Sequence, residues 1–355
     1  MERGILFERL RPHLGRALAA IAAAAAALAF GGAHAQAVQG VTDTEILLGT
    51  HQDLSGPAAS FGGPMRDGLM LAVEEINAAG GIHGRKIRLL VEDSGYDPKR
   101  AALVTQKLVT QDKVFAMIST LGSPTSLASM PIALDRGVPM LFSSGAAESS
   151  YLPYHPLKFG LLAPGGPQAR AAVRYAIEKL GKKRFGLLYQ DDESGIGVAH
   201  AVEAQLKAHG MSLAEKTSYK RGEIDFSAPV ARLKAAKVDV VMLATVVRET
   251  AAVAIEAKKQ GLGADLIAPT GSINPATLKL GGEALEGMYV TTQWVPIAAQ
   301  ERTPALNAVL ERFRNRFGRD AEDGVNLTYT AMMLFAEGAR NAGPTLTAQT
   351  LQQGL

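Results

Sequence analysis

Short apolar runs alternate with amphipathic helical stretches along most of the chain, and this alternation constrains the fold more than any other feature. The apolar runs have the length and composition of strands, and they cover 45–50, 86–91, 114–118, 138–142, 159–162, 184–189, 238–244, 266–268 and 287–292. The stretches between them carry apolar residues at helical spacing, and they cover 64–79, 97–110, 126–134, 167–180, 195–209, 226–235, 248–260, 304–317 and 325–342. Strands and helices that alternate in this way form parallel sheets covered on both faces. The order predicts an α/β fold with two doubly wound parallel-sheet lobes.

The turn after the third predicted strand is the most informative single stretch. The apolar run 114–118 stops at residues 119–126 (STLGSPTS), where a helical pattern begins. A helix start presents unpaired N–H groups and a partial positive charge, so it suits an anion such as a carboxylate. A helix capped by Ser123 or Thr125 explains the same residues without a ligand. Other predicted strands also end in small polar residues, at 143–146 and 270–272, and ligands of such folds bind at the carboxyl ends of strands. This repetition favours a ligand site.

The first 37 residues have the layout of a secretory signal peptide. Residues 1–16 are basic, residues 17–30 are an unbroken apolar run, and small residues follow, so we expect cleavage after Ala35 or Ala37. The apolar run is short for a membrane span, and an uncleaved anchor is the alternative. The chain has no cysteine, which excludes a lipoprotein anchor, disulfides and thiolate metal sites. We therefore expect a mature protein in the periplasm.

Charge and motifs argue against nucleic-acid binding and against catalysis. The 37 Lys and Arg residues nearly balance the 34 Asp and Glu residues, and no basic stripe occurs. The sequence has no Gly-x-Ser-x-Gly elbow and no phosphate-binding loop with a lysine, and its seven histidines lack metal-ligand spacing. Glu92 and Asp93 are adjacent in a predicted strand, so they point to opposite faces. We expect no enzymatic activity, cofactor, metal or nucleic-acid partner.

Several motifs together suggest a family. They are Ser55-Gly56-Pro57 with Phe61-Gly62, INAAGGIHGRKI at 76–87, Glu92-Asp93 with Asp97-Pro98, Asp225-Phe226-Ser227 with Leu233, and Glu286-Gly287. From about Thr44 to Gly343 the chain resembles the branched-chain amino-acid-binding (leucine/isoleucine/valine-binding) proteins, the secreted receptors of ABC importers. The resemblance implies a type I periplasmic binding protein fold, in which hinge crossovers join two lobes that close on a ligand.

The resemblance also implies domain boundaries. Residues 38–161 and 290–343 form lobe one, and residues 162–289 and 344–355 form lobe two, after the signal peptide at 1–37. In relatives the chain continues past a helix like 348–353 and adds a strand, so the C-terminal part of lobe two is expected to be incomplete here.

In the family, two turns of lobe one hold the ligand. The first binds the ligand carboxylate through N–H and hydroxyl groups, and the second supplies further donors and contacts the α-amino group. The matching residues are Leu121, Gly122, Ser123, Thr125, Ser144, Gly145 and Ala146.

Lobe two departs from the family pattern. Two family tyrosines fall on Ser194 and Val246, and the glutamate that pairs with the ligand ammonium falls on Thr270. An unpaired buried ammonium is unfavourable, and the acidic run 191–193 is either its substitute partner or a solvated loop. Phe61 falls near the cleft, where it packs either on an apolar ligand tail or in the core.

These residues favour a specific kind of ligand. The turn for the carboxylate is present and the glutamate for the ammonium is absent, so an aromatic or aliphatic acid without the amino group fits better than an amino acid. We expect a monomeric binding protein that delivers an amino acid or related small carboxylate to an inner-membrane ABC permease. The alternative is a ligand-sensing receptor that feeds a signalling protein.

Overall fold

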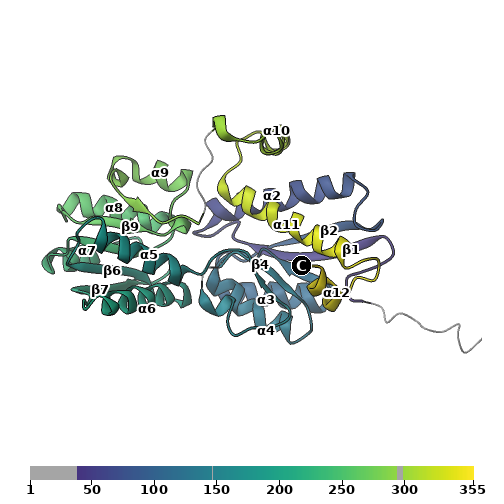
Figure 1. The fold of residues 1–355 in the computed structure, drawn as a ribbon, viewed down its shortest axis with the longest axis horizontal. Helices are drawn as coiled ribbons and strands as arrows, with labels where there is room; N and C mark the ends of the chain where they lie inside the picture. The colour runs from purple at the N-terminus through teal and green to yellow at the C-terminus, as the bar shows by residue number, and fades with distance from the viewer. Residues whose placement is uncertain (1–37, 146, 294–298) are drawn as a thin grey trace, which may run out of the picture. The chain divides into compact units, whose positions relative to one another are not determined.

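The computed structural model describes residues 38–145, 147–293 and 299–355, and within them the strands form two five-stranded parallel sheets (Figure 1). The first sheet has the order β2-β1-β3-β4-β5 and the second the order β10-β9-β8-β6-β7. Because neighbouring strands run parallel, the chain crosses between them through helices. The predicted fold class is confirmed. The signal-peptide prediction for 1–37 lies outside the described residues.

The first sheet and the helices around it are called the first lobe. Its strands are β1 (Glu45–Gln52), β2 (Lys86–Asp93), β3 (Ala116–Ile118), β4 (Met140–Ser143) and β5 (Lys158–Gly160). Between them run α2 (Ala59–Ala78), α3 (Pro98–Thr110), α4 (Ser123–Leu134) and the 3-10 turn η1 (Glu148–Ser150). On the face covered by α3 and α4, Leu47, Met117 and Met140 of the sheet pack against Leu108 and Met130 of the helices. The turn between β3 and α4 is thus anchored between a buried strand and a buried helix.

The second sheet and its helices form the second lobe. Its strands are β6 (Phe185–Gln190), β7 (Glu215–Tyr219), β8 (Val240–Ala244), β9 (Asp265–Ala268) and β10 (Tyr289–Val290). Its helices are α5 (Gly165–Glu178), α6 (Glu193–Ala208), α7 (Ser227–Ala235), α8 (Val247–Gln260) and α9 (Pro275–Gly281), with 3-10 turns η2 (Thr270–Ser272) and η3 (Gly282–Leu285). Adjacent residues of β6 serve opposite faces, because Leu187 packs with Val173 and Val202 of α5 and α6, whereas Leu188 packs with Val253 of α8.

The C-terminal helices return to the first lobe. They are η4 (Ala299–Glu301), α10 (Pro304–Phe317), α11 (Asp323–Asn341) and α12 (Ala348–Gly354). α11 lies closely against α2, where a Cβ at Gly68 would overlap the Val325 carbonyl oxygen. The Thr328 hydroxyl donates to the Met65 carbonyl at 2.7 Å across the same contact.

The position of α12 corrects one predicted boundary. Residues 344–355 were expected in lobe two, but α12 packs on α11, where Leu351 is fully buried. The Asn341 side chain donates to the Gly354 carbonyl at 3.1 Å. The short helix therefore completes the first lobe, because its buried face has its partner there. The other lobe boundaries remain predictions.

Several element boundaries also differ from the sequence prediction. α2 begins at Ala59 rather than 64 and includes Pro64 within its first turns, and α4 begins at Ser123 rather than 126. β7 was not predicted, because only Thr217 and Tyr219 are buried in this edge strand. The seven-residue helix α9 was also missed. Among the described residues, no helix combines the length and apolar character that spanning a lipid bilayer requires.

Candidate functional site

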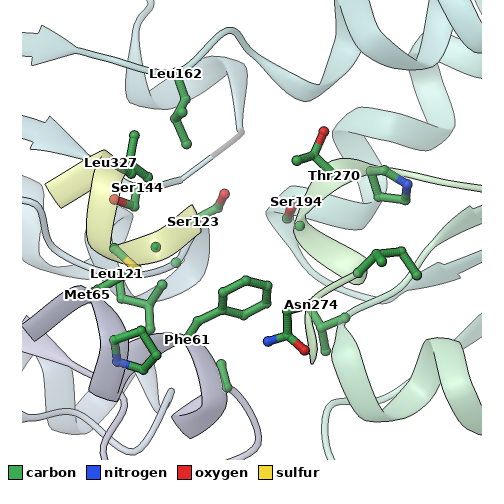
Figure 2. A pocket seen from close by; sticks show the side chains of 18 of the residues that line it. Phe61, Met65, Leu121, Ser123, Ser144, Leu162, Ser194, Thr270, Asn274 and Leu327 are labelled. Carbon is green, nitrogen blue, oxygen red and sulfur yellow. The ribbon is translucent and has the colours of Figure 1, made fainter. Parts of the chain in front are cut away.

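A cavity of about 660 Å³ lies at the carboxyl ends of strands from both sheets (Figure 2). Its wall from the first lobe consists of Ala58, Phe61, Pro64, Met65, Tyr96, Leu121, Gly122, Ser123 and Ser144. Its wall from the second lobe consists of Gln190, Ser194, Gly195, Val198, Ala244, Thr245, Val246, Pro269, Thr270, Gly271, Ile273, Asn274 and Pro275. The remaining wall includes Leu162, Gly165, Gln168, Gln293 and residues at the start of α11. This volume is typical of a site for one small molecule.

The turn between β3 and α4 is held rigidly at the cavity. Gly122 has φ +88°, a conformation that favours glycine, and α4 begins at the next residue. The Gly122 N–H donates to the Ser144 carbonyl at 3.3 Å, and the Ser144 N–H donates to the Thr120 carbonyl at 2.8 Å. The Leu121 N–H donates to the His51 carbonyl at 3.2 Å. The two predicted ligand turns are therefore joined to one another by backbone hydrogen bonds.

The first turn of α4 presents hydrogen-bond donors at this wall. Among the described residues, the N–H groups of Ser123 and Thr125 have no protein acceptor, and Pro124 has no N–H. The Ser123 oxygen accepts from the Ala147 N–H at 3.0 Å, which leaves its O–H free to donate. In Figure 2 the Ser123 hydroxyl points into the cavity. With the helix dipole behind them, these donors can hold an anionic oxygen.

Most of the predicted site residues line the cavity. They are Phe61, Leu121, Gly122, Ser123, Ser144, Ser194, Val246 and Thr270. Thr125 and Gly145 are not among the lining residues, and their contact with a ligand stays a prediction. The Thr125 hydroxyl donates to the carbonyls of Leu121 and Gly122, and Gly145 lies against the Ser123 backbone. The prediction for Ala146 lies outside the described residues.

Apolar side chains make up much of the cavity surface. In Figure 2 the Phe61 ring extends toward the second lobe, between Leu121 and Asn274. Phe61 also packs against the buried cluster that contains Met65 and Tyr96. Phe61 therefore belongs both to the edge of the core and to the cavity wall, and its contact with a ligand stays a prediction.

The charged residues of the wall are neutralised within the protein. Arg319 pairs with Asp67 at 2.7 Å and with Glu322 at 3.4 Å, and Asp320 pairs with Arg314 at 2.7 Å. These three wall residues lie near the start of α11, which approaches the cavity at Leu327 in Figure 2.

Thr270 carries no negative charge for an ammonium, whereas Glu249 of α8 is buried and its carboxylate oxygens have no hydrogen-bond partner among the described residues. Thr270 donates its hydroxyl to the Thr291 carbonyl. In the acidic run 191–193, Asp192 caps α6 by accepting from the N–H groups of Ser194 and Gly195 at 3.0 and 3.1 Å. Asp192 also pairs with Arg221 at 3.2 Å, so this carboxylate stabilises a helix start.

The sequence analysis missed Tyr96, Gln190 and Asn274. Tyr96 follows β2 and has φ +56°, and burial raises the pKa of its phenol. Asn274 caps α9 and also donates to the Ser60 hydroxyl of the first lobe at 3.2 Å. The sequence signal for Asn274 was its position before Pro275, which is typical of a helix start. No signal in the sequence indicated that Tyr96 reaches the cavity.

The fold and the cavity define a class of protein, namely two-lobed α/β proteins that bind a small molecule at their strand ends. Within the described residues no group of three or more His, Asp or Glu side chains is placed to hold a metal ion. Comparison with known families then specifies the class. The sequence model of the family described as "Periplasmic binding protein" matches residues 45–355, and the chain belongs to this family.

Individual relatives agree with this assignment. The chain is 28% identical over 302 residues to the leucine-, isoleucine-, valine-, threonine-, and alanine-binding protein of Pseudomonas aeruginosa, covering 84% of this chain and 80% of that protein. It is 28% identical over 285 residues to the Leu/Ile/Val-binding protein of Escherichia coli strain K12, covering 80% and 76%. Among solved structures, a substrate-binding periplasmic protein from Ralstonia solanacearum matches with a TM-score of 0.78 and 25% identity, covering 87% of this chain and 88% of that one.

The predicted resemblance and general function are therefore confirmed. The chain is a substrate-binding protein of the periplasmic binding family, and this kind of protein is a non-enzymatic component of transport. The alternative of a receptor for signalling is not favoured by these relatives.

Proposed function

We propose that the protein binds a small organic acid that has an apolar body and no α-amino group, and delivers it to an inner-membrane ABC permease. One observation carries this proposal: hydrogen-bond donors at the start of α4 face a largely apolar cavity. A carboxylate would accept from Ser123 and the free N–H groups, and its hydrocarbon part would contact Phe61, Met65 and Leu121.

The need of an α-ammonium for a charged partner separates this ligand from an amino acid, because Thr270 stands where the family has a glutamate. An α-ammonium lies next to the carboxylate, so its partner must lie close to the turn at Gly122. The side chains of Tyr96, Leu121 and Met65 lie by that turn and carry no negative charge, while the buried Glu249 of the second lobe interacts electrostatically with Tyr96. Burial of a charge without a partner is unfavourable by several kcal/mol or more. The named relatives bind amino acids, so an amino acid is the second candidate.

Matched pairs of ligands test the proposal. Isothermal titration calorimetry would compare leucine with 4-methylpentanoate and phenylalanine with 3-phenylpropanoate, because the members of each pair differ only in the amino group. We expect the acids to bind at least about tenfold more tightly, which corresponds to about 1.4 kcal/mol. Tighter binding of either amino acid would overturn the proposal and support the second candidate.

Replacement of Ser123 tests the carboxylate position. Ser123→Ala removes one donor to a charged acceptor, and we expect the affinity for the bound acid to fall by about 1–3 kcal/mol. Because Ala147 also loses its acceptor, the thermal unfolding midpoint is measured in parallel. Ser149→Ala changes an exposed serine outside the cavity wall and should leave the affinity unchanged. Equal affinities of the Ser123→Ala variant and the parent protein would remove Ser123 from the site.

The proposal includes location and assembly. We infer that a signal peptide directs the chain to the periplasm and is removed there after Ala35 or Ala37, without a lipid anchor, and that the mature protein is a monomer. Membership of a family of periplasmic proteins supports this location. N-terminal sequencing of protein purified from the periplasm, and its mass by light scattering, would test both parts.

A further inference from the structure

Tyr96 belongs to the first lobe, lines the cavity and contacts a residue of the second lobe. It follows β2 in a turn where Gly95 and Tyr96 both have positive φ values, +57° and +56°. Such a conformation is unfavourable for a tyrosine, so the surrounding contacts must hold it in place. The side chain is 5% exposed and lines the cavity.

Within the first lobe, the Tyr96 ring supports the turn between β3 and α4 at Gly122, which is called the carboxylate turn below. The ring lies so close to Gly122 that a Cβ at Gly122 would overlap its edge atoms. Leu121 and Met65 pack in the same buried cluster. Movement of the ring would therefore displace the turn that begins α4, because closely packed groups cannot shift independently.

The polar partners of Tyr96 belong to the second lobe. The guanidinium carbon of Arg221 lies 5.1 Å from the centre of the Tyr96 ring, within the range of a cation–π interaction. The hydroxyl end interacts with the side chain of Gln190, the last residue of β6. Gln190 in turn accepts from the Tyr219 hydroxyl at 3.4 Å and donates to Asp192.

These partners lead to the opposite wall of the cavity. Arg221 pairs with Asp192 at 3.2 Å, and Asp192 accepts from the N–H groups of Ser194 and Gly195, which line the cavity. A continuous set of contacts thus runs from Gly122 through Tyr96, Arg221 and Asp192 to the start of α6. This set joins the two walls of the cavity.

We propose that Tyr96 is a positioning residue that couples the carboxylate turn of the first lobe to the α6 wall of the second lobe. Its contact with Arg221 stabilises the arrangement in which both walls face one ligand. The inference takes the cavity as the ligand site from the proposed function, but it does not depend on which ligand binds. Another contact between the lobes joins the Asn274 side chain to the Ser60 hydroxyl at 3.2 Å.

The proposal is tested by measuring the separation of the lobes without ligand. The chain has no cysteine, so spin labels can be attached to cysteines introduced at exposed Gln111 of the first lobe and exposed Lys207 of the second. Double electron–electron resonance then gives the distribution of label distances. We expect Tyr96→Leu and Arg221→Gln each to lower the population of the shorter distances by about 2- to 10-fold, because each removes the cation–π contact.

Further variants separate coupling from a general loss of stability. Tyr96→Phe keeps the ring and should have a smaller effect than Tyr96→Leu. Tyr329→Phe removes a hydroxyl that donates to Glu75 at 2.7 Å between α11 and α2, and it should leave the distances unchanged. The Tyr96→Leu and Arg221→Gln double variant should shift the distance distribution no further than the stronger single variant, since each single variant already lacks the cation–π contact.

The outcomes distinguish this inference from the proposed function. Distance distributions of Tyr96→Leu and Arg221→Gln that match the parent protein would overturn the coupling role, whatever the ligand is. Failure of 3-phenylpropanoate to bind the parent protein would count against the proposed ligand class and would not affect the ligand-free distances.

Discussion

At the scale of single residues, Gly122 combines a backbone conformation that favours glycine with a place in the cavity wall. Its φ of +88° favours glycine, and its missing side chain leaves room for the Tyr96 ring. A glycine at this position therefore permits both the turn that begins α4 and the packing of the residue that reaches the second lobe.

Gly122→Ala should impair both stability and binding. The backbone conformation of Gly122, with φ 88° and ψ 142°, costs about 1–3 kcal/mol for a residue with a Cβ, and the overlap with Tyr96 adds to this cost. Gly137→Ala is the matched control, because Gly137 has φ +71° and open space around it. Urea denaturation should show a larger loss of unfolding free energy for Gly122→Ala than for Gly137→Ala. Equal losses of unfolding free energy would mean that the Tyr96 ring moves away from the new Cβ without destabilising the fold.

His51 should make stability depend on pH. Its imidazole is fully buried in β1, with Nε2 2.9 Å from the Ser129 hydroxyl, and burial lowers its pKa from 6.5 to about 4. The unfolded chain therefore takes up a proton below pH 6.5 that the folded chain takes up only near pH 4. The contribution of His51 to the free energy of unfolding is fully present above pH 6.5. It falls by about 3 kcal/mol as the pH drops toward 4.

Replacement of His51 tests this dependence. Unfolding free energies of His51→Gln, measured between pH 4 and pH 7.5, should decline less steeply with acid than those of the parent. Ser129→Ala keeps the imidazole, so it should lower stability yet retain the parent slope. A slope unchanged in His51→Gln would assign the acid sensitivity to other groups.

The residues of the site differ in how readily the sequence reveals them. Ser123 and Ser144 follow strands in runs of small polar residues, and that local pattern is sufficient to place them at strand ends. Thr125 belongs to the same run, but its hydroxyl turns back to its own helix start, which depends on a rotamer that the sequence does not specify. Tyr96 is placed by tertiary packing against Gly122, which is 26 residues away in sequence, so no local pattern indicates it.

At the scale of elements, the periodicity of apolar residues predicted the long helices and buried strands, but it did not predict the short or exposed elements. β7 presents buried Thr217 and Tyr219 among polar residues, and α9 depends on a capping box of Asn274 and Thr277 more than on an apolar face. α12 was recognised as a helix, but its lobe was not, because the sequence does not show which surface its apolar residue meets.

Leu351 tests the packing of α12 on α11. It is the buried residue of this helix and is fully inaccessible, so Leu351→Ala should lower the unfolding free energy by about 2–5 kcal/mol through loss of packing. Gln349→Ala changes an exposed residue of the same helix and should have little effect. Comparable losses for the two variants would show that α12 contributes no packed contact in solution.

At the scale of the whole molecule, the cavity draws its walls from both lobes, so a bound ligand should stabilise segments that are far apart in sequence. The start of α4 contributes Ser123, and the start of α6 contributes Ser194 and Gly195. A ligand that contacts only one wall would stabilise one lobe, whereas a ligand held between the walls must stabilise both.

Hydrogen exchange can distinguish these cases. At a ligand concentration about 100 times the dissociation constant, binding stabilises the native state by about 2.7 kcal/mol, enough to slow exchange through opening about 100-fold. With the acid that binds most tightly, we expect amides at the starts of α4 and α6 to slow together. Those of α12 should change least, because Leu351 packs behind α11 and away from the cavity wall. Protection confined to α4 would mean that the carboxylate turn binds the acid without the second lobe, contrary to a site shared by both walls.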